Sequence, residues 1–181
     1  MNDIADGKVF IACSLDGFIA RKDGDIDWLL RYPETGEDYG YAAFMDTVDG
    51  LVMGRASFEK VRTFDKWPYP KPVVVMSATL TQDDVPDALE QKVRIAGGSP
   101  SEVMRRLAGE GWRAAYVDGG KLIQSFLAEG LISEMTITQI PVLLGSGRPL
   151  FGDMENDIHL TLEGSKGYPS GFVQSRYRID R

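Results

Sequence analysis

The stretch that decides the fold reads Val52-Met53-Gly54-Arg55-Ala56-Ser57-Phe58-Glu59. A short apolar strand ends at Gly54, and polar, helix-forming residues follow at once. The first N–H groups of a helix have no partners within the helix, and the positive end of the helix dipole lies there, so such a junction can hold a phosphate. Arg55 adds donors that can grip a phosphate in a bidentate manner. An arginine after a strand is also often a solvated surface residue, so this segment alone leaves both interpretations open.

Further β-type runs lie on both sides of this junction. The chain contains eight such runs, at residues 8–13, 50–54, 72–76, 93–96, 114–118, 133–140, 158–167 and 171–179. Continuous apolar runs such as Val73-Val74-Val75-Met76 suit central strands that are covered on both faces. The last run instead alternates, with Val173, Tyr177 and Ile179 on one face. This pattern predicts an antiparallel strand paired with 158–167.

Helical patterns fall between the strands. The spacing of Tyr41, Phe44, Met45 and Val48 predicts a helix over about 37–48, and another starts at Arg55 or Ala56. The capping box Ser99-Pro100-Ser101-Glu102 starts a helix that runs to about Ala108. Ile123, Phe126 and Leu127 share a face of a further helix that ends before Gly130. The sequence therefore predicts one α/β domain over 1–181, with a mostly parallel central sheet, helices on both faces and a C-terminal antiparallel hairpin.

Composition excludes several classes of function. The 181 residues carry a formal net charge of −7, which argues against nucleic-acid binding, and no apolar run is long enough for a membrane span. The N-terminus lacks the features of a signal peptide, and the single cysteine, Cys13, fits a reducing cytoplasm. One histidine, His159, and the lack of a Cys/His cluster predict no metal site. We expect a cytoplasmic protein that acts on a small molecule.

Glycine and hydroxyl residues follow four of the predicted strands. These segments are Gly54-Arg55-Ala56-Ser57, Ser77-Ala78-Thr79, Gly97-Gly98-Ser99 and Asp118-Gly119-Gly120-Lys121. Because ligands of open α/β sheets collect at the carboxyl ends of strands, the four segments indicate an extended anionic ligand with several phosphates. The fingerprint of a Rossmann dinucleotide fold is absent, since Gly145-Ser146-Gly147 is followed by Arg148-Pro149 and by no helical pattern.

The motifs, taken in order, resemble the dihydrofolate reductase superfamily. They resemble most closely its branch that contains the C-terminal reductase domain of bifunctional riboflavin biosynthesis proteins. The resemblance rests on five segments, Lys8–Ala20, Asp27-Trp28, Val52–Ser57, Val117–Leu122 and Pro141–Phe151. It covers nearly the whole chain and implies a dihydrofolate-reductase-like fold with NADPH as hydride donor.

The resemblance also implies positions for the cofactor. Ala12 and Ile19 would present backbone groups to the nicotinamide carboxamide. In the strand-to-helix motif at Gly54, Arg55 would contact the adenosine 2′-phosphate and Ser57 the pyrophosphate. Ser77 would lie near the adenosine end. The pyrophosphate would lie at a helix N-terminus formed by Gly119, Gly120, Lys121 and Leu122.

Three carboxylates are candidates for the catalytic group. Folate reductases place an acid early in the helix that corresponds to 37–48, and here Asp38 is the best substitute, although an acid in a first turn is often a surface group favoured by the helix dipole. Asp27, beside Trp28, is the second candidate. Asp118 is the third, because the riboflavin branch often has an acid before the glycine pair, and it would either contact the substrate or only hold the loop. Asp16 lies in a turn, and we interpret it as structural.

The leading interpretation is an NADPH-dependent reductase of a small heterocyclic substrate. It would be related to the 5-amino-6-(5-phosphoribosylamino)uracil reductase of riboflavin biosynthesis, in which the reduced centre is a ribose imine. The alternatives are a true dihydrofolate reductase and an NADP(H)-binding module that has lost catalysis. The resemblance also implies a homodimer, for which Leu143, Leu144, Leu150 and Phe151 form either an apolar surface patch or part of the core.

Overall fold

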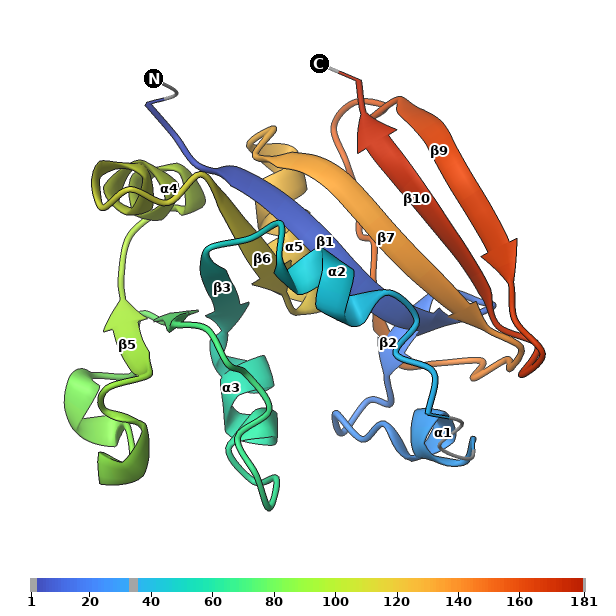
Figure 1. Ribbon diagram of the computed structural model, residues 1–181, viewed down its shortest axis with the longest axis horizontal. Coiled ribbons are helices and arrows are strands. Elements are labelled where there is room, and N and C mark those ends of the chain that lie inside the picture. Colours follow the sequence, from blue (N-terminus) through green and yellow to red (C-terminus); the bar gives the residue numbers. More distant parts are fainter. Residues whose placement is uncertain (1–2, 33–35, 181) are drawn as a thin grey trace.

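The fold is built on an eight-stranded sheet, shown in the computed structural model of Figure 1, which describes residues 3–32 and 36–180. The strand order across the sheet is β5-β4-β3-β6-β1-β7-β10-β9. The strands are β1 (Asp6–Ser14), β3 (Gly50–Gly54), β4 (Val73–Met76), β5 (Val93–Ala96), β6 (Ala114–Asp118), β7 (Ile132–Ile140), β9 (Leu160–Gly167) and β10 (Val173–Ile179). All eight predicted strands are confirmed.

The sheet is parallel from β5 to β7 and antiparallel beyond it. β1 pairs in parallel with both β6 and β7, whereas β10 pairs antiparallel with β7 and with β9. β9 and β10 form the predicted hairpin, which extends past the helices in Figure 1. Of the three residues predicted on one face of β10, Ile179 is buried, Tyr177 is half-buried and Val173 is exposed. Only the end of the strand at Ile179 therefore reaches the core.

Helices cover both faces of the parallel part. Helices α4 (Pro100–Gly109) and α5 (Gly120–Ala128) pack on one face, and α2 (Tyr41–Met45) and α3 (Arg55–Val61) pack on the other. The capping box at Ser99 forms as predicted, since Ser99 Oγ accepts the Glu102 N–H and Glu102 accepts the Ser99 N–H. The α/β class with helices on both faces is confirmed.

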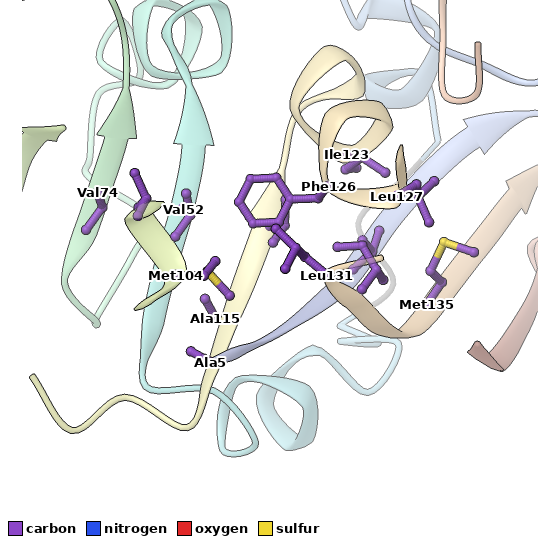
Figure 2. Close-up of a cluster of buried hydrophobic side chains, with 14 of the residues drawn as sticks. Ala5, Val52, Val74, Met104, Ala115, Ile123, Phe126, Leu127, Leu131 and Met135 are labelled. Atoms are coloured by element: carbon purple, nitrogen blue, oxygen red, sulfur yellow. The ribbon is translucent and has the colours of Figure 1, made fainter. Parts of the chain in front are cut away.

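The larger core lies under α4 and α5. In Figure 2, Phe126 of α5 projects toward Val52 of β3, with Met104 of α4 and Ala115 of β6 below it. Phe126 and Met104 are 0% exposed, so both side chains are wholly removed from water. The continuous apolar strands are thus covered on both faces, as their composition predicts.

The helix predicted over 37–48 is shorter, at Tyr41–Met45. Tyr39 and Gly40 have φ angles of 54° and 81°, in the left-handed region that a helix cannot continue through. The Asp38 carboxylate accepts N–H groups from Gly40 (2.9 Å) and Ala42 (3.1 Å) and so caps the start of α2. The sequence periodicity extended beyond the helix because Val48 is buried without being helical.

Several short elements were not predicted. They are α1 (Asp27–Leu30), the 3-10 turns η1 (Gln82–Asp84) and η2 (Asp87–Leu89), and strands β2 (Phe18–Ala20) and β8 (Arg148–Pro149), which pair antiparallel. Elements of two to four residues are too short to produce a periodic pattern. β2 and β8 bring the segment after β7 against the turn that follows β1.

None of the helices in the described part of the chain is long and apolar enough to span a membrane.

Candidate cofactor and substrate site

The carboxyl ends of β3, β4 and β6 meet at one edge of the sheet. Met53 pairs with Asp118 across β3 and β6, so Gly54 and Gly119 emerge side by side. Ser77 follows β4 on the opposite flank of β3, and its N–H donates to Ala96 O of β5 (3.1 Å). The predicted phosphate loops therefore share the edge at which α/β sheets bind ligands.

The contacts around Gly119 bring three predicted residues together. A Cβ at Gly119 would lie 2.7 Å from Ser57 Oγ and 3.9 Å from Gly54 N, and the φ of Gly119 is +104°. Only glycine combines this backbone conformation with so close an approach. Gly54, Ser57 and Gly119 thus form one corner of the site.

Gly120 joins a second pair of predicted residues. A Cβ at Gly120 would lie 2.8 Å from Pro149 O and 2.9 Å from Ile19 Cδ1. The start of α5 therefore packs directly against β2 and β8. Ile19 and the glycine pair, far apart in the sequence, meet at the same place.

The N-terminus of α5 is suited to an anion. Its N-cap residue is Gly119, its first turn contains no acid, and no side chain of residues 3–32 or 36–180 caps it. The N–H groups of Gly120, Lys121 and Leu122 thus receive no capping side chain from the described residues, and the Lys121 side chain is exposed.

Arg55 is anchored rather than freely solvated. Its Nε donates to Glu59 Oε1 (2.7 Å) and its Nη1 donates to Thr79 Oγ1 (2.9 Å). Ser77 Oγ accepts the N–H groups of Thr79 (3.1 Å) and Leu80 (3.0 Å), which fixes the loop after β4 beside Arg55. The remaining guanidinium N–H groups take no part in these two bonds, and the arginine side chain is 52% exposed.

The last cofactor candidate, Ala12, lies on β1 opposite Thr138 of β7 and packs against the cluster of Trp28, Ile140 and Phe172. The arrangement fits a dinucleotide whose phosphates lie at α5 and whose outer phosphate lies at Arg55. The contacts of the individual residues with a cofactor stay predictions.

Two of the three candidate acids are occupied by other groups. Asp38 caps α2, and the backbone N–H groups of Gly40 and Ala42 lower its pKa. Asp27 accepts from Arg21 Nε (2.5 Å) and Nη2 (3.1 Å), and this pair lowers the Asp27 pKa. Both carboxylates are exposed and held in the ionised form, which suits positioning better than proton donation.

Asp118 is different. It ends β6, is half-buried, and its position immediately precedes the glycine pair. Burial raises the pKa of Asp118 to about 6, although the Gly119 N–H partly counteracts the shift. A carboxyl group with a pKa in this range can exist in both protonation states near neutral pH, as catalytic acids require.

Three tyrosines that the sequence analysis did not assign to the site lie near enough to Asp118 to be affected by its charge. Burial, followed by the nearby Asp118 charge, raises the pKa values of Tyr41, Tyr69 and Tyr116. Tyr116 Oη donates to Phe10 O (2.8 Å), and the Phe44 ring lies edge-on against the Tyr116 ring at 5.1 Å. These phenols remain neutral donors beside the carboxylate.

One of these tyrosines could have been found from sequence. Tyr116 precedes Asp118 by two residues in β6 and therefore points to the same face of the sheet. Tyr69 gave no such signal, because it lies in the Trp67–Pro72 segment that we interpreted as a connector. Its ring contacts Trp67 at 5.4 Å, and only the folded chain brings it near β6.

Asp16 has the structural role predicted for it. Its carboxylate holds its own turn and also a distant loop. Its carboxylate accepts from Ser14 Oγ (2.6 Å) and from the N–H groups of Leu144 (3.1 Å) and Gly145 (2.7 Å). The turn after β1 is thereby fastened to the loop after β7.

Within residues 3–32 and 36–180, no three His, Cys, Asp or Glu side chains form a metal-binding group.

Comparison with known proteins shows the family to which the chain belongs. The family model of the RibD C-terminal domain matches residues 7–174. A solved protein from Shewanella sp. PV-4, named provisionally for riboflavin biosynthesis, is 44% identical, with a TM-score of 0.91 over 97% of this chain and 99% of that one. The uncharacterized protein YwjB of Bacillus subtilis (strain 168) is 37% identical over 93% of this chain and 95% of its own length.

The fold is shared with a more distant solved structure. The dihydrofolate reductase of Enterococcus faecalis, solved with NADP(H) and RAB-propyl, matches at a TM-score of 0.66 with 16% identity, over 97% of each chain. The fold is therefore dihydrofolate-reductase-like. The match over residues 7–174 is the more specific finding. The chain belongs to the RibD C-terminal domain family.

Proposed function

We propose that this protein is an NADPH-dependent reductase of a small heterocyclic substrate, similar to 5-amino-6-(5-phosphoribosylamino)uracil. The observation that carries the proposal is Asp118, a carboxyl group with a pKa of about 6 that adjoins the glycine corner of the predicted cofactor site. A reductase that transfers a hydride to an imine carbon also needs a group that donates a proton to the neighbouring nitrogen.

The surroundings of Asp118 favour recognition of a nitrogen heterocycle. In its ionised form the carboxylate accepts N–H groups, and in its protonated form it donates one proton. Tyr41 and Tyr69 add neutral hydroxyl groups whose raised pKa values keep them protonated. A uracil or pteridine ring presents both donors and acceptors along one edge, which matches this mixed set.

The cofactor part of the proposal rests on the corner formed by Gly54, Ser57 and Gly119, on the start of α5, and on Arg55. NADPH, when bound, supplies the hydride. The protein's own residues hold its phosphates, and Ile19 and Ala12 line the predicted nicotinamide end. The NADP(H) named with the Enterococcus faecalis enzyme supports the same choice of cofactor.

The direct test is turnover. Purified protein with NADPH and 5-amino-6-(5-phosphoribosylamino)uracil should consume NADPH, with dihydrofolate assayed in parallel. Turnover of dihydrofolate alone would favour a folate reductase, which the use of Asp38 as a helix cap disfavours. Saturable NADPH binding without oxidation of any substrate in the panel would instead favour a non-catalytic module.

Arg55→Ala should narrow the preference for NADPH over NADH by about tenfold or more, because a charged, bidentate phosphate contact is lost. The measurement is kcat/KM, or Kd from calorimetry, with both nucleotides. Arg94→Ala is the matched control, since Arg94 is also exposed and pairs with Glu110 on a different part of the sheet edge. An unchanged ratio in Arg55→Ala would remove the 2′-phosphate assignment.

We propose further that the protein is a homodimer, with the β9–β10 hairpin in the interface. β9 is an edge strand whose residues are all exposed, and Leu162 and Val173 are 56% and 43% exposed. An exposed edge strand that carries apolar side chains such as Leu160 and Leu162 invites association with another copy. Of the four residues considered from sequence, Leu150 is 1% exposed and belongs to the core, whereas Leu143 is 70% exposed.

Leu162→Glu should weaken this dimer by about tenfold or more, because it places a charge within an apolar interface. Light scattering coupled to size separation measures the effect over a dilution series. Leu30→Glu, at a 72% exposed position on α1, is the control and should leave the mass unchanged. A monomeric wild-type protein at all concentrations would refute the dimer.

A further inference from the structure

We propose that Glu59 limits the preference of this protein for NADPH over NADH, because its carboxylate competes with the 2′-phosphate of NADPH for Arg55. The inference rests on the proposed function, in which Arg55 contacts that phosphate. Glu59 lies one helical turn after Arg55 on α3 and was not among the residues predicted for the site. It would be a further residue that sets the specificity for the cofactor.

The ion pair between Arg55 and Glu59 uses donors that a phosphate would need. Arg55 Nε donates to Glu59 Oε1 (2.7 Å), and Arg55 Nη1 donates to Thr79 Oγ1 (2.9 Å). A guanidinium grips a phosphate best through a fork of two parallel N–H groups. The fork that includes Nε is open to a phosphate only if Glu59 releases it. In either case the carboxylate remains beside the phosphate and repels it.

The charges near Arg55 already balance one another. Glu59 pairs with Arg55 directly. Hydrogen bonds from Thr81 lower the pKa of Asp84 in η1, and the charges of Arg62 and Arg55 lower it further, so this second carboxylate also lies within range of Arg55. A phosphate monoester carries about −1.5 to −2 charge at pH 7. Its arrival would leave this region with an excess of negative charge.

NADH does not meet this repulsion. Its adenosine ribose carries a 2′-hydroxyl group, which brings no charge to the side of Glu59. A carboxylate can accept a hydrogen bond from such a hydroxyl, as acids do in the NAD sites of other folds. The ion pair of Arg55 with Glu59 can also stay intact. Glu59 therefore weakens the binding of NADPH and does not weaken the binding of NADH.

The opposite role for Glu59 would be to hold Arg55 in place for the phosphate. Glu59→Gln separates the two roles, because glutamine keeps an oxygen that can accept from Arg55 Nε but carries no charge. A holding role predicts an unchanged or lower affinity for NADPH, whereas competition predicts a higher one. Thr79 continues to bind Nη1 in this variant, so the arginine stays directed toward the loop after β4.

The experiment compares the Kd values of NADPH and NADH, measured by calorimetry on the intact protein. Glu59→Gln should raise the preference for NADPH about fivefold, with the Kd of NADH about unchanged. The gain should shrink between about 50 and about 500 mM NaCl, because salt screens exposed charges. Glu110→Gln is the matched control, since it removes the charge from the exposed Arg94–Glu110 pair and should leave the ratio unchanged.

A double variant tests whether the effect passes through the arginine. In an Arg55→Ala background, Glu59→Gln should raise the preference for NADPH less, because the group for which carboxylate and phosphate compete is gone. An NADPH preference that is unchanged or lower in Glu59→Gln, or a gain of the same size in Glu110→Gln, would overturn the role of Glu59 and leave the reductase proposal standing. Failure of the wild-type protein to bind either nucleotide would overturn both.

Discussion

Asp118→Asn is expected to lower kcat by about 100-fold or more, with NADPH affinity unchanged. The amide keeps the size and the Gly119 contact of the side chain but cannot exchange a proton with the substrate. Steady-state kinetics gives kcat, and calorimetry gives the NADPH affinity of the same preparation. Asp38→Asn is the control, because Asp38 is bonded to the start of α2 and should affect stability more than turnover.

The pH dependence of the wild-type enzyme follows from the same group. Since the pKa of Asp118 is raised to about 6, the carboxyl group is mostly protonated below this pH and ionised above it. If the protonated form is the donor, kcat/KM should fall as pH rises through about 6. Asp118→Asn should show no such step. A wild-type profile that is flat between pH 5 and about 7 would exclude Asp118 as the proton donor.

The same substitution should stabilise the fold. An acid whose pKa is raised in the folded state binds its proton more tightly there than in the unfolded chain, so its ionisation at neutral pH opposes folding. Asp118→Asn should therefore raise the free energy of unfolding at pH 7 by about 1–3 kcal/mol, a gain that shrinks as pH falls below about 6 and is small near pH 4. Denaturant unfolding at pH 7 and at pH 4 measures both. A destabilised variant at pH 7 would contradict the burial argument.

Gly120→Ala is the second large expected effect, a loss of NADPH affinity of about 100-fold. The added Cβ would lie 2.8 Å from Pro149 O and 2.9 Å from Ile19 Cδ1, closer than any carbon can approach. Backbone cannot yield as a side chain does, so the start of α5 must move away from β2 and β8. The N–H groups at the start of α5, which are predicted to bind phosphate, would then move away from the predicted nicotinamide contact at Ile19.

A matched glycine on the neighbouring helix isolates this effect. Gly109 ends α4, and a Cβ added there would meet no atom of the described residues within 4 Å. Its φ is also outside the left-handed region. Gly109→Ala should bind NADPH normally and gain up to about 1 kcal/mol of stability. Normal NADPH affinity in a folded Gly120→Ala variant would remove the α5 N-terminus from the site.

The strand positions were predictable because their signals are local. Runs such as Val73-Val74-Val75-Met76 reflect burial that the segment carries in its own composition. The alternation after Gly171 marked the last strand correctly, although only Ile179 of its predicted face is buried. The helix over Tyr41–Met45 was predicted too long, since periodicity records which residues are buried and not where the backbone turns. Tyr39 and Gly40 have left-handed backbone conformations and prevent the helix from starting before Tyr41, but this pair has only a weak sequence signal.

The site was predictable where glycine or a strand end marks it, and not where distant loops complete it. Gly119 and Asp118 follow an apolar strand, so their place at the sheet edge could be deduced. Tyr69 could not, because it reaches Asp118 through a loop whose path no local pattern specifies. The bond from Asp16 to Gly145 joins residues that only the tertiary fold makes neighbours.

The order of the strands has a consequence for how the chain is made. β1 leaves the ribosome before the other strands of the sheet, yet Asp6 at its start pairs with Ala114, and its other neighbour is β7. Until the second half of the polypeptide has been synthesised, this apolar strand has neither of its ladder partners. Its pairings are of high contact order, and they slow folding and expose the strand to aggregation during translation. We therefore expect the sheet to close only after β6 and β7 have been synthesised, when β1 gains both of its neighbours.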